Sequence, residues 1–512
     1  MVDSGVVMDG YHFIMGSLAL FGFVVTYATV PLSRKAALKY QMVSMPGGRR
    51  THVQPTPLLG GLAIFVPFAL VFCTFFILAV TGWISLDQPK KMQMLSLFLG
   101  TTWMLILGTL DDKKDLGWGK KLGGQFLGVG ILVLGGHNIA TATVPLIGPV
   151  EFGWYGIPLF VLAVLAITNA INLIDGMDGL AGGICFFAAL TSAVIGVVKG
   201  DVFTAVIGFT AAGSLLAFLI FNLPPASIFM GDGGAMMMGF LLGTLATSSA
   251  AISPGQRLGT SVMILIPFLP FGIPLFEVVL SIFRRLIRGQ AVFLGDGDHL
   301  HHRLRGRFED PRLSVGVFYF FSAALCALTL FALIGLDFAL AKLVIAVIIT
   351  VILIGIIGSI RLYNVDKLAV TLKNRPHFKF LGGFLRFMKY RMRRAESLHE
   401  LLALLETGVR DLRFDRVEVV SDGHVTFKWT NPRLVHPSSP RIYSEESLDN
   451  GRIVVKWARP VHDDTIYNEY LMLTWYRFLT YIRQEVANHS EELTASRKGN
   501  VIGLPSKQPP QT

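Results

Sequence analysis

The sequence is poor in charged residues. Asp, Glu, Lys and Arg together make up 15% of the 512 residues, whereas 52% are hydrophobic. A soluble protein of this length carries about 25% charged residues. The apolar residues also fall into blocks of roughly 16 to 24, long enough for a helix to cross the hydrocarbon core of a bilayer. This shortage of charge excludes a soluble protein. The continuous apolar blocks exclude a membrane β-barrel, whose strands alternate in polarity.

Cysteine is also scarce. Cys73, Cys185 and Cys326 are the three cysteines of the chain, and each lies inside an apolar block. We therefore expect no disulfide framework. The formal net charge of +11 is typical either of a nucleic-acid-binding protein or of a membrane protein with basic cytoplasmic loops. The second explanation fits an apolar chain better, so we expect the lipid bilayer as a partner and no nucleic acid.

The apolar blocks predict an all-α polytopic membrane protein with about 11 transmembrane helices. The predicted spans are residues 11–31, 58–81, 94–110, 122–137, 154–170, 179–198, 203–222, 234–250, 260–283, 313–335 and 340–360. The loops after odd-numbered spans carry about four times as many Lys and Arg residues as the other loops, which places them in the cytoplasm. We therefore expect a multi-pass protein of the plasma (inner) membrane with its N-terminus outside.

The composition changes after residue 361. We predict a polytopic core at 1–361, a basic juxtamembrane linker at 362–384, a small cytosolic α+β domain at 385–488 and a disordered tail at 489–512. Basic residues between Lys379 and Arg394 are expected to lie against anionic lipid headgroups. Apolar spacing predicts helices at 395–410 and 465–487 and strands at 415–420, 424–429 and 452–457. No catalytic motif is evident in this extension.

Polar residues gather in four loops that the order of the spans places on the cytoplasmic face. These loops carry, in turn, Asp111 and Asp112; Asn169, Asn172, Asp175 and Asp178; Asp232; and Asp296, Asp298, His299, His301, His302 and Arg303. Acids with only structural roles would have no reason to choose one face. The grouping therefore predicts an active site at the cytoplasmic surface of the membrane.

The motifs differ in specificity. The pair Asp111-Asp112 alone also fits a solvated helix end that Lys113 and Lys114 neutralise. The segment NAINLIDGMDGL at 169–180 is more specific, because two amides, two carboxylates and two glycines suit a tight turn beside a ligand. Asp232, in a glycine-rich loop at the start of a helix, suits a hard cation or a phosphate. Simple helix capping remains the alternative for this last residue.

The segment GDGDHLHHRL at 295–304 has three histidines in four positions, followed by Arg303. Such a cluster fits zinc. However, acids and amides predominate and no cysteine lies near, so Mg²⁺ or Mn²⁺ with a phosphorylated substrate fits better. Carboxylates for a divalent cation and basic groups for phosphates are what phosphoryl transfer needs. The residues thus predict a metal-assisted phosphoryl-type transferase that acts on a membrane lipid.

The same motifs resemble those of the polyprenyl-phosphate N-acetylhexosamine-1-phosphate transferases, also called glycosyltransferase family 4. The matching pieces follow the family's order: PTPLLGG (55–61), GTLDDKKDL (108–116), the 169–180 segment, FMGDGG (229–234) and DHLHHRL (298–304). The His-x-His-His form is similar to the branch that uses UDP-N-acetylglucosamine. The branch that uses UDP-MurNAc-pentapeptide typically has consecutive histidines there.

The resemblance implies a reaction and a set of roles. A UDP-N-acetylhexosamine and undecaprenyl phosphate would be the substrates, and UMP would be released. Asp232 and Asn172 would hold Mg²⁺ (or Mn²⁺). Asp111 and Asp112 would lie beside the lipid phosphate, one of them as the base, and Asp175 and Asp178 would organise the nucleotide-sugar side. The residues expected to contact phosphate or sugar are His52, Lys121, Asn169, His299, His301, His302 and Arg303.

Several alternatives stay open at this point. The acceptor phosphate attacks directly or through a covalent aspartyl-phosphate, and we favour direct attack because a phosphate monoester is mostly dianionic at pH 7. A lipid or ion transporter would need acids near the bilayer midplane, which this chain lacks. A phospho-MurNAc-pentapeptide transferase and an inactive scaffold also remain. The sequence leaves open which amino-sugar is transferred and the oligomeric state, a homodimer included.

Overall fold

The structure of the chain is a computed structural model. It describes residues 4–44, 55–144, 148–250, 266–288, 310–335, 375–392, 394–395, 398–412, 414–421, 424–430, 441–448, 453–460, 471–472 and 474–482. The chain divides into two compact units. The first comprises residues 1–282 and 295–355, and the second comprises 283–294 and 356–512.

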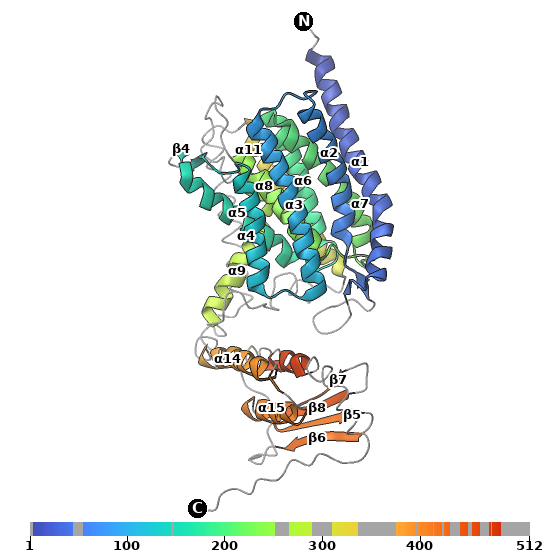
Figure 1. Cartoon of the computed structure of the whole chain (residues 1–512), viewed down its shortest axis with the longest axis vertical. Helices are drawn as coiled ribbons and strands as arrows, with labels where there is room; N and C mark the ends of the chain where they lie inside the picture. Colours follow the sequence, from blue (N-terminus) through green and yellow to red (C-terminus); the bar gives the residue numbers. More distant parts are fainter. Residues whose placement is uncertain are drawn as a thin grey trace, which may run out of the picture. The chain divides into compact units, whose positions relative to one another are not determined.

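Helices make up almost all of the first unit (Figure 1). The helices are α1 (Ser4–Lys39), α2 (Gly60–Val80), α3 (Gln88–Lys114), α4 (Trp118–Leu134), α5 (Gly156–Ile174), α6 (Leu180–Lys199), α7 (Val202–Asn222), α8 (Gly231–Ala250), α11 (Pro311–Gly335) and α9 (Gly272–Arg288), of which residues 283–288 belong to the second unit. Two short antiparallel pairs join β1 (Val43–Ser44) to β2 (Thr56–Pro57) and β3 (Thr141–Val144) to β4 (Gly148–Glu151). Short 3₁₀ turns, η1 (Gly153–Tyr155) and η2 (Ile266–Phe271), precede α5 and α9.

Seven of the described helices are long and apolar enough to cross a membrane, namely α1, α2, α3, α5, α6, α7 and α11. The segment Pro267–Phe283 is a shorter apolar helix. Helix α4, with 17 residues, and α8, rich in Gly, Ser and Thr, are not among the seven. The described helices overlap every predicted span except 340–360, which lies outside the described residues. The polytopic helical fold is therefore confirmed, whereas the total of about 11 spans stays a prediction.

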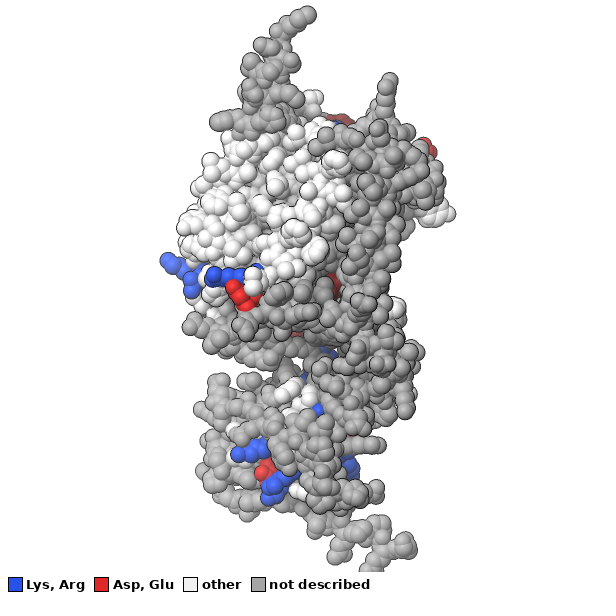
Figure 2. Space-filling model, turned by 180° about the vertical axis from the view of Figure 1, so that it is seen from behind, with Lys and Arg blue, Asp and Glu red and all other residues white. Residues whose placement is uncertain are grey.

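The outer surface of the helices suits lipid. Large apolar side chains are exposed on the flanks of several helices, among them Leu20, Val24, Ile77, Ile106 and Phe126. On the face seen in Figure 2, a broad uncharged belt covers the flank of the helices, and the described charged residues lie at the ends of the unit. An apolar belt between polar ends is what a bilayer requires, because charges are costly in its hydrocarbon core.

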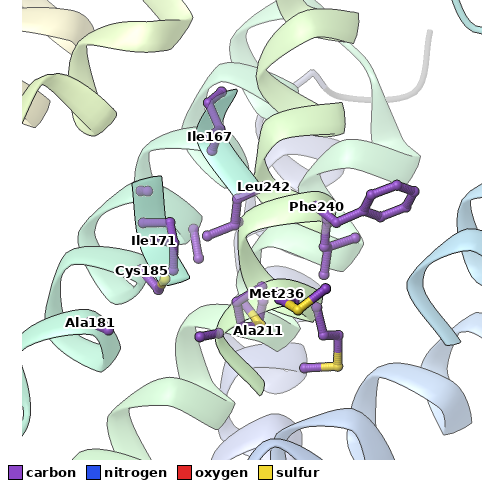
Figure 3. Packing of buried hydrophobic residues seen from close by; sticks show 14 of the residues in the cluster. Ile167, Ile171, Ala181, Cys185, Ala211, Met236, Phe240 and Leu242 are labelled. Carbon is purple, nitrogen blue, oxygen red and sulfur yellow. The ribbon is translucent and has the colours of Figure 1, made fainter. Parts of the chain in front are cut away.

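Helix α8 forms the centre of the first unit. It lies against α2, α3, α5 and α6, and its apolar side chains from Ala235 to Ala246 are almost fully buried on every side. A helix that is apolar all round is typical of such an enclosed position. Figure 3 shows the packing around it, with Met236, Phe240 and Leu242 of α8 beside Ile167 and Ile171 of α5, Ala181 and Cys185 of α6 and Ala211 of α7. This packing places the first turn of α8, which contains Asp232, at the end of the bundle.

Helices α1 and α7 approach each other closely through small residues. A Cβ placed on Gly213 of α7 would meet the backbone of Ala19 in α1, and one on Gly22 of α1 would meet the backbone of Thr210 in α7. The Ser214 hydroxyl lies 3.4 Å from the Gly22 carbonyl oxygen. Small residues that allow close backbone contact are a common basis of helix association in membranes.

The second unit combines helices with a sheet. It contains α14 (Arg375–Met392), α15 (Leu398–Asp411) and a four-stranded antiparallel sheet in the order β6-β5-β8-β7. The strands are β5 (Arg416–Ser421), β6 (His424–Thr430), β7 (Arg441–Leu448) and β8 (Ile453–Pro460), and residues 471–472 and 474–482 are helical. A core of its own holds these elements together, with Met388, Leu405, Val417, Trp475 and Phe478 fully buried or nearly so.

Two elements of this unit were not predicted. Helix α14 begins at Arg375, within the segment interpreted as a basic linker, because its basic residues hide an apolar face formed by Leu381, Phe384 and Met388. Strand β7 contains two adjacent glutamates, and its polar and apolar residues do not alternate regularly, so the sequence did not indicate a strand. It pairs along its whole length with β8. The predicted helix at 395–410 and the strands at 415–420, 424–429 and 452–457 correspond to α15, β5, β6 and β8.

The contact between α1 and α7 gives a first test. Gly213→Ala should lower the stability of the protein in detergent by about 1–3 kcal/mol, because the added methyl group must push the two backbones apart. The midpoint of thermal unfolding measures this effect. Gly130→Ala in α4 is the matched control, since nothing lies within 4 Å of a Cβ at Gly130. Equal midpoints for the two variants would contradict the close contact.

Candidate active site

The candidate site begins with the two acids at the end of α3. Asp111 is 8% exposed. Its Oδ1 accepts a hydrogen bond of 2.8 Å from the Leu116 backbone N–H, and its Oδ2 lies 2.7 Å from the Lys121 ammonium. Asp112 accepts hydrogen bonds from the backbone N–H groups of Asp232, at 3.0 Å, and Gly233, at 3.3 Å. The two neighbouring acids thus serve different partners, as adjacent positions on a helix allow.

Lys121, at the start of α4, is the centre of the site. Its Nζ lies 2.7 Å from Asp111 Oδ2 and 2.6 Å from Asp232 Oδ2, and it donates a 2.9 Å hydrogen bond to Asn172 Oδ1. These three oxygens come from α3, α8 and α5. Asn172 also donates a 2.9 Å hydrogen bond from Nδ2 to Asp232 Oδ1. Four helices therefore meet in one charged network, although their residues lie far apart in the sequence.

Asp232 stands in the first turn of α8, where the first backbone N–H groups of a helix have no partner within the helix. Asp112 accepts two of them. The preceding residue, Gly231, has a φ of +72°, a conformation that favours glycine. A Cβ there would also meet the Leu58 carbonyl and lie 2.7 Å from Asp112 Oδ2. The turn that presents Asp232 therefore requires glycine at this position.

The segment PTPLLGG (55–61) holds this turn in place through backbone hydrogen bonds. The Phe229 N–H donates to the Pro57 carbonyl at 2.8 Å, Gly60 N–H donates to the Phe229 carbonyl at 2.9 Å, and Gly61 N–H donates to the Met230 carbonyl at 3.0 Å. A Cβ on Gly61 would meet the backbone of Gly234, and one on Gly108 would meet the backbone of Asp232. Residues 55–61 and α3 thus pack closely against the start of α8 and hold it in place. The sequence alone did not indicate this role.

Asn169 and Gln125 form a reciprocal amide pair. Asn169 Nδ2 donates to Gln125 Oε1 at 2.7 Å, and Gln125 Nε2 donates to Asn169 Oδ1 at 3.2 Å. Asn169 also donates to the Leu165 carbonyl at 2.8 Å. Gln125 lies one turn after Lys121 on α4, and Asn169 lies one turn before Asn172 on α5. The pair therefore fixes the position of α4 along α5 so that Lys121 contacts Asn172. Direct contact of Asn169 with substrate stays a prediction.

Asp178 lies beside the site in the turn between α5 and α6. Its Oδ2 accepts a 2.9 Å hydrogen bond from the Ala226 N–H. Asn222 continues this link, since its Oδ1 accepts from the Gly179 N–H at 3.1 Å and its Nδ2 donates to the Ile228 carbonyl at 2.8 Å. The Tyr319 hydroxyl of α11 donates to the Gly179 carbonyl at 2.6 Å. This network joins the 175–180 turn to the segment that leads into α8.

Asp175 ends α5 and is partly exposed. Burial of its carboxyl group, together with the negative charges of Asp232, Asp112 and Asp178, raises the pKa of Asp175 well above its ordinary value. Four carboxylates thus lie near one another, and the charges of nearby acids oppose ionisation. A cation bound among them would relieve this repulsion and favour the charged form of Asp175.

The structure brings together three of the four predicted polar loops, at the end of the first unit where α3 and α5 stop (the lower end in Figure 1). Asp111, Asp112, Lys121, Asn172 and Asp232 are directly linked. Both acids of the Asp111-Asp112 pair are bonded within the protein, so they do not form a merely solvated helix end. The predicted site residues that lie outside the described part of the chain are His52, Asp296, Asp298, His299, His301, His302 and Arg303, and their roles stay predictions.

Three positioning residues were not predicted: Gln125, Asn222 and Tyr319. Gln125 and Asn222 are polar amides inside or at the end of otherwise apolar helices, and such residues in a membrane segment often face a partner inside the protein. This signal was available in the sequence. Tyr319 gave no comparable signal, because an aromatic residue in an apolar helix is ordinary.

The donor set of the site can be compared with what different metals need. The part of the chain that the structure describes contains no cluster of three or more His, Cys, Asp or Glu side chains suited to a metal ion. At Lys121, however, two carboxylate oxygens and one amide oxygen converge on a single positive charge within 2.9 Å. The ammonium occupies the position of a small cation, and an all-oxygen set of this kind fits Mg²⁺ or Mn²⁺.

Comparison with known proteins connects this site to one family. Residues 94–250, which contain every linked residue of the network, match the family model described as "Glycosyl transferase family 4". A protein of Bacillus subtilis (strain 168), described as "Probable undecaprenyl-phosphate N-acetylglucosaminyl 1-phosphate transferase", is 32% identical over 303 residues. The match covers 58% of this chain and 80% of that protein.

Two further relatives show the range of similarity. The "Decaprenyl-phosphate N-acetylglucosaminephosphotransferase" of Mycobacterium leprae (strain TN) is 34% identical over 310 residues, which are 56% of this chain and 76% of that protein. A "Phospho-N-acetylmuramoyl-pentapeptide-transferase" of Acetivibrio thermocellus is 27% identical over 333 residues, which are 61% of this chain and 93% of that protein. The chain is thus less similar to this last protein than to the two N-acetylglucosamine enzymes.

The contact between α3 and the start of α8 gives a test of the site's construction. Gly108→Ala should displace the Asp232 turn, because its methyl group would meet the Asp232 and Gly233 backbone. We expect activity to fall at least about 100-fold, since a small misplacement of a positioned group has this effect. Gly123→Ala is the control, with nothing within 4 Å of its Cβ. Turnover is measured as UMP release, as described below. Normal turnover by Gly108→Ala would contradict the close packing of α3 against the start of α8.

Proposed function

The chain belongs to glycosyl transferase family 4, and from this membership we propose that it transfers an N-acetylhexosamine 1-phosphate from a UDP-sugar to undecaprenyl phosphate. The transferred group is GlcNAc-1-phosphate, and UMP is released. The product, a polyprenyl-diphospho-sugar, would start a cell-surface polysaccharide. The similarity to the Bacillus subtilis and Mycobacterium leprae relatives and the His-x-His-His pattern at 299–302 support GlcNAc over the muramoyl-pentapeptide.

One observation of the structure carries the proposal. Lys121 holds Asp111, Asp232 and Asn172 around a single positive charge at the end of a bundle of apolar helices. The diphosphate of the UDP-sugar and the phosphate of the lipid need cations around them. The lipid tail needs an apolar surface. A charged centre at the end of membrane helices offers both.

The same oxygens define the cation that the site would hold. Asp232, Asn172 and Asp111 would bind Mg²⁺, with Mn²⁺ as the alternative. A metal there would neutralise the diphosphate of the UDP-sugar and the negative charge that develops on the departing UMP. Asp111 joins the pair of metal ligands expected from the family resemblance, because its Oδ2 shares the Lys121 ammonium with Asp232.

The chain's own residues would position and neutralise the reacting groups. An oxygen of undecaprenyl phosphate attacks the sugar-bearing phosphorus, a P–O bond forms there, and the bond to the UMP oxygen breaks. Lys121 would transfer its hydrogen bonds from the carboxylates to phosphate oxygens as the substrates bind. The acceptor phosphate is mostly dianionic at pH 7, so no strong base is needed. Asp112, whose oxygens are both engaged by backbone N–H groups, would brace the site.

Release of UMP tests the reaction directly. Purified protein in detergent should release UMP from UDP-GlcNAc only when both undecaprenyl phosphate and Mg²⁺ are present. Asp232→Ala should abolish this release, because the variant loses the carboxylate that bridges Lys121 and Asn172. UDP-GalNAc and UDP-MurNAc-pentapeptide, tested in parallel, distinguish the donors. If folded protein releases UMP from none of these donors, the proposed reaction is wrong.

Lys121 allows a sharper test of the cation site. Lys121→Met should make the metal-free protein less stable by roughly 1–3 kcal/mol, because Asp111 and Asp232 lose their shared counter-ion. Mg²⁺ should stabilise this variant at lower concentrations than it stabilises the natural protein, since it no longer displaces an ammonium group. Turnover should nevertheless fall at least about 100-fold, because a positive charge on the phosphates is missing.

The control is Lys120→Met, which removes the neighbouring, exposed lysine and should leave both stability and turnover unchanged. Thermal unfolding in EDTA and at rising Mg²⁺ concentrations measures the first effect, and UMP release measures the second. If the Mg²⁺ dependence of stability is the same in Lys121→Met and in the natural protein, the metal does not bind at these oxygens.

A further inference from the structure

Helix α14 of the second unit has two unlike faces. One face enters the core of the unit through Leu381, Leu385, Met388 and Met392, which are all buried. The other face exposes three aromatic rings, with Phe380 50%, Phe387 54% and Tyr390 58% accessible to solvent. The side chains of the first face already supply the contribution of α14 to the hydrophobic core. The aromatic residues on the second face therefore contribute nothing to the core and call for another explanation.

The exposed aromatic residues lie among basic ones. Within Arg375–Met392 the helix has no acidic residue, and its basic residues are Arg375, Lys379, Arg386, Lys389 and Arg391. The Arg391 guanidinium lies 5.9 Å from the centre of the Phe387 ring, and that of Arg394 lies 5.4 Å from the centre of the Tyr390 ring. These stacked pairs hold the positive groups beside the rings.

The two pairs line one wall of a groove between α14 and α15, which lie side by side (Figure 1). The groove has a volume of about 430 Å³ and is lined by Phe387, Tyr390, Arg391 and Arg394 and, from α15, by residues that include Ala403, Thr407 and one acid, Glu400. The surface formed by Phe380, Arg386, Phe387, Tyr390 and Arg391 of α14, together with Arg394 just after the helix, is called the aromatic-basic face below. It combines cationic groups, exposed rings and a groove large enough for a phosphate headgroup.

We propose that the aromatic-basic face docks the second unit on the surface of a bilayer through anionic phospholipid headgroups. Arginine guanidinium groups bind the phosphates of such lipids, and aromatic rings are favoured at the depth of the headgroups. A helix with basic and aromatic residues on one face is typical of interfacial binding. The first unit ties the chain to a membrane, so the effective concentration of headgroups around the second unit is high.

This occupant fits better than a protein partner. A second copy of the chain would bring the same excess of positive charge to the face, and the two surfaces would repel each other. An acidic protein would satisfy the arginines, but it would have to compete with a bilayer that is always present. Docking on lipid needs no further component, and it is independent of the reaction proposed above.

Gly383 offers a place for a reporter. It lies on the helix between Phe380 and Phe387, and nothing lies within 4 Å of a Cβ there. The full-length protein, with Cys73→Ser and Gly383→Cys, would carry a nitroxide label at residue 383. The remaining cysteines, Cys185 and Cys326, are buried. A second labelled protein with Thr480→Cys, an exposed position on the 474–482 helix, serves as the reference site.

Each labelled protein would be reconstituted in nanodiscs of phosphatidylcholine alone or with about 30% phosphatidylglycerol, a level that gives a bilayer a strongly negative surface. Collision of the label with oxygen and with a water-soluble nickel complex is then measured by electron paramagnetic resonance. We expect the anionic bilayer to raise the oxygen-to-nickel ratio at residue 383 and to leave it unchanged at residue 480. High salt should reverse the change, because it screens the attraction.

Variants separate docking from general effects of charge. Combined Arg386→Gln, Arg391→Gln and Arg394→Gln should abolish the difference between the two bilayers at residue 383. Phe380→Ser with Phe387→Ser should reduce it. Arg410→Gln is the matched control, because it removes a cation from an exposed surface pair with Glu406 on α15 and should leave the difference intact. All these side chains are exposed, so the domain should stay folded, which circular dichroism checks.

Two results would overturn the proposal. One is an equal oxygen-to-nickel ratio at residue 383 in both bilayers, with the domain folded. The other is strong dipolar coupling between labels at residue 383 of two chains, which would show that a second copy covers the face. A ratio that changes with anionic lipid in the natural protein, but not after loss of the three arginines, supports docking on lipid.

Discussion

Two hydrogen bonds from the start of α8 to Asp112 join α8 to α3 at the candidate site. The backbone N–H groups of Asp232 and Gly233 donate to the two oxygens of this carboxylate, and the positive end of the helix favours the negative charge. This contact fixes the distance between α3 and α8, and glycines at 61, 108 and 231 remove the side chains that would keep the backbones apart. Once the two helix ends are joined, Asp232 must lie next to Asp111 and Lys121. The chemistry of the site therefore depends on a contact of the backbone.

The position of the site at a helix end follows from the membrane. Five acids and a lysine would be very costly in the middle of apolar helices, whereas helix ends reach the polar surface. At the same time, the apolar flanks of the helices offer a surface to a lipid tail. A transferase that joins a water-soluble sugar nucleotide to a lipid phosphate needs both environments within a few ångströms. The end of the bundle provides this boundary.

Several elements of the structure could be predicted from the sequence because their signals are local. Long apolar runs predicted the membrane helices, and the Asp, Asn and Gly motifs predicted which loops meet. The interactions that depend on three-dimensional packing could not be predicted. The Gln125–Asn169 pair joins two helices, and residues 55–61 support α8 through backbone hydrogen bonds, which the pattern of side chains does not reveal. Helix α14 was missed because its basic residues conceal the apolar side. The roles of the histidines at 299–302 lie outside the described residues and stay predictions.

Lys121 would supply a counter-ion to the carboxylates of the proposed cation and phosphate site before the substrates bind. Carboxylates that approach each other without a counter-ion repel one another and raise their pKa values. Burial, together with the nearby acids, raises the pKa of Asp175 in this way. The ammonium of Lys121 neutralises Asp111 and Asp232 at 2.7 and 2.6 Å. A long, flexible side chain can leave these oxygens when a metal arrives and then reach a phosphate oxygen nearby. One lysine would thereby act as the counter-ion of Asp111 and Asp232 before substrate binding and as a substrate ligand afterwards.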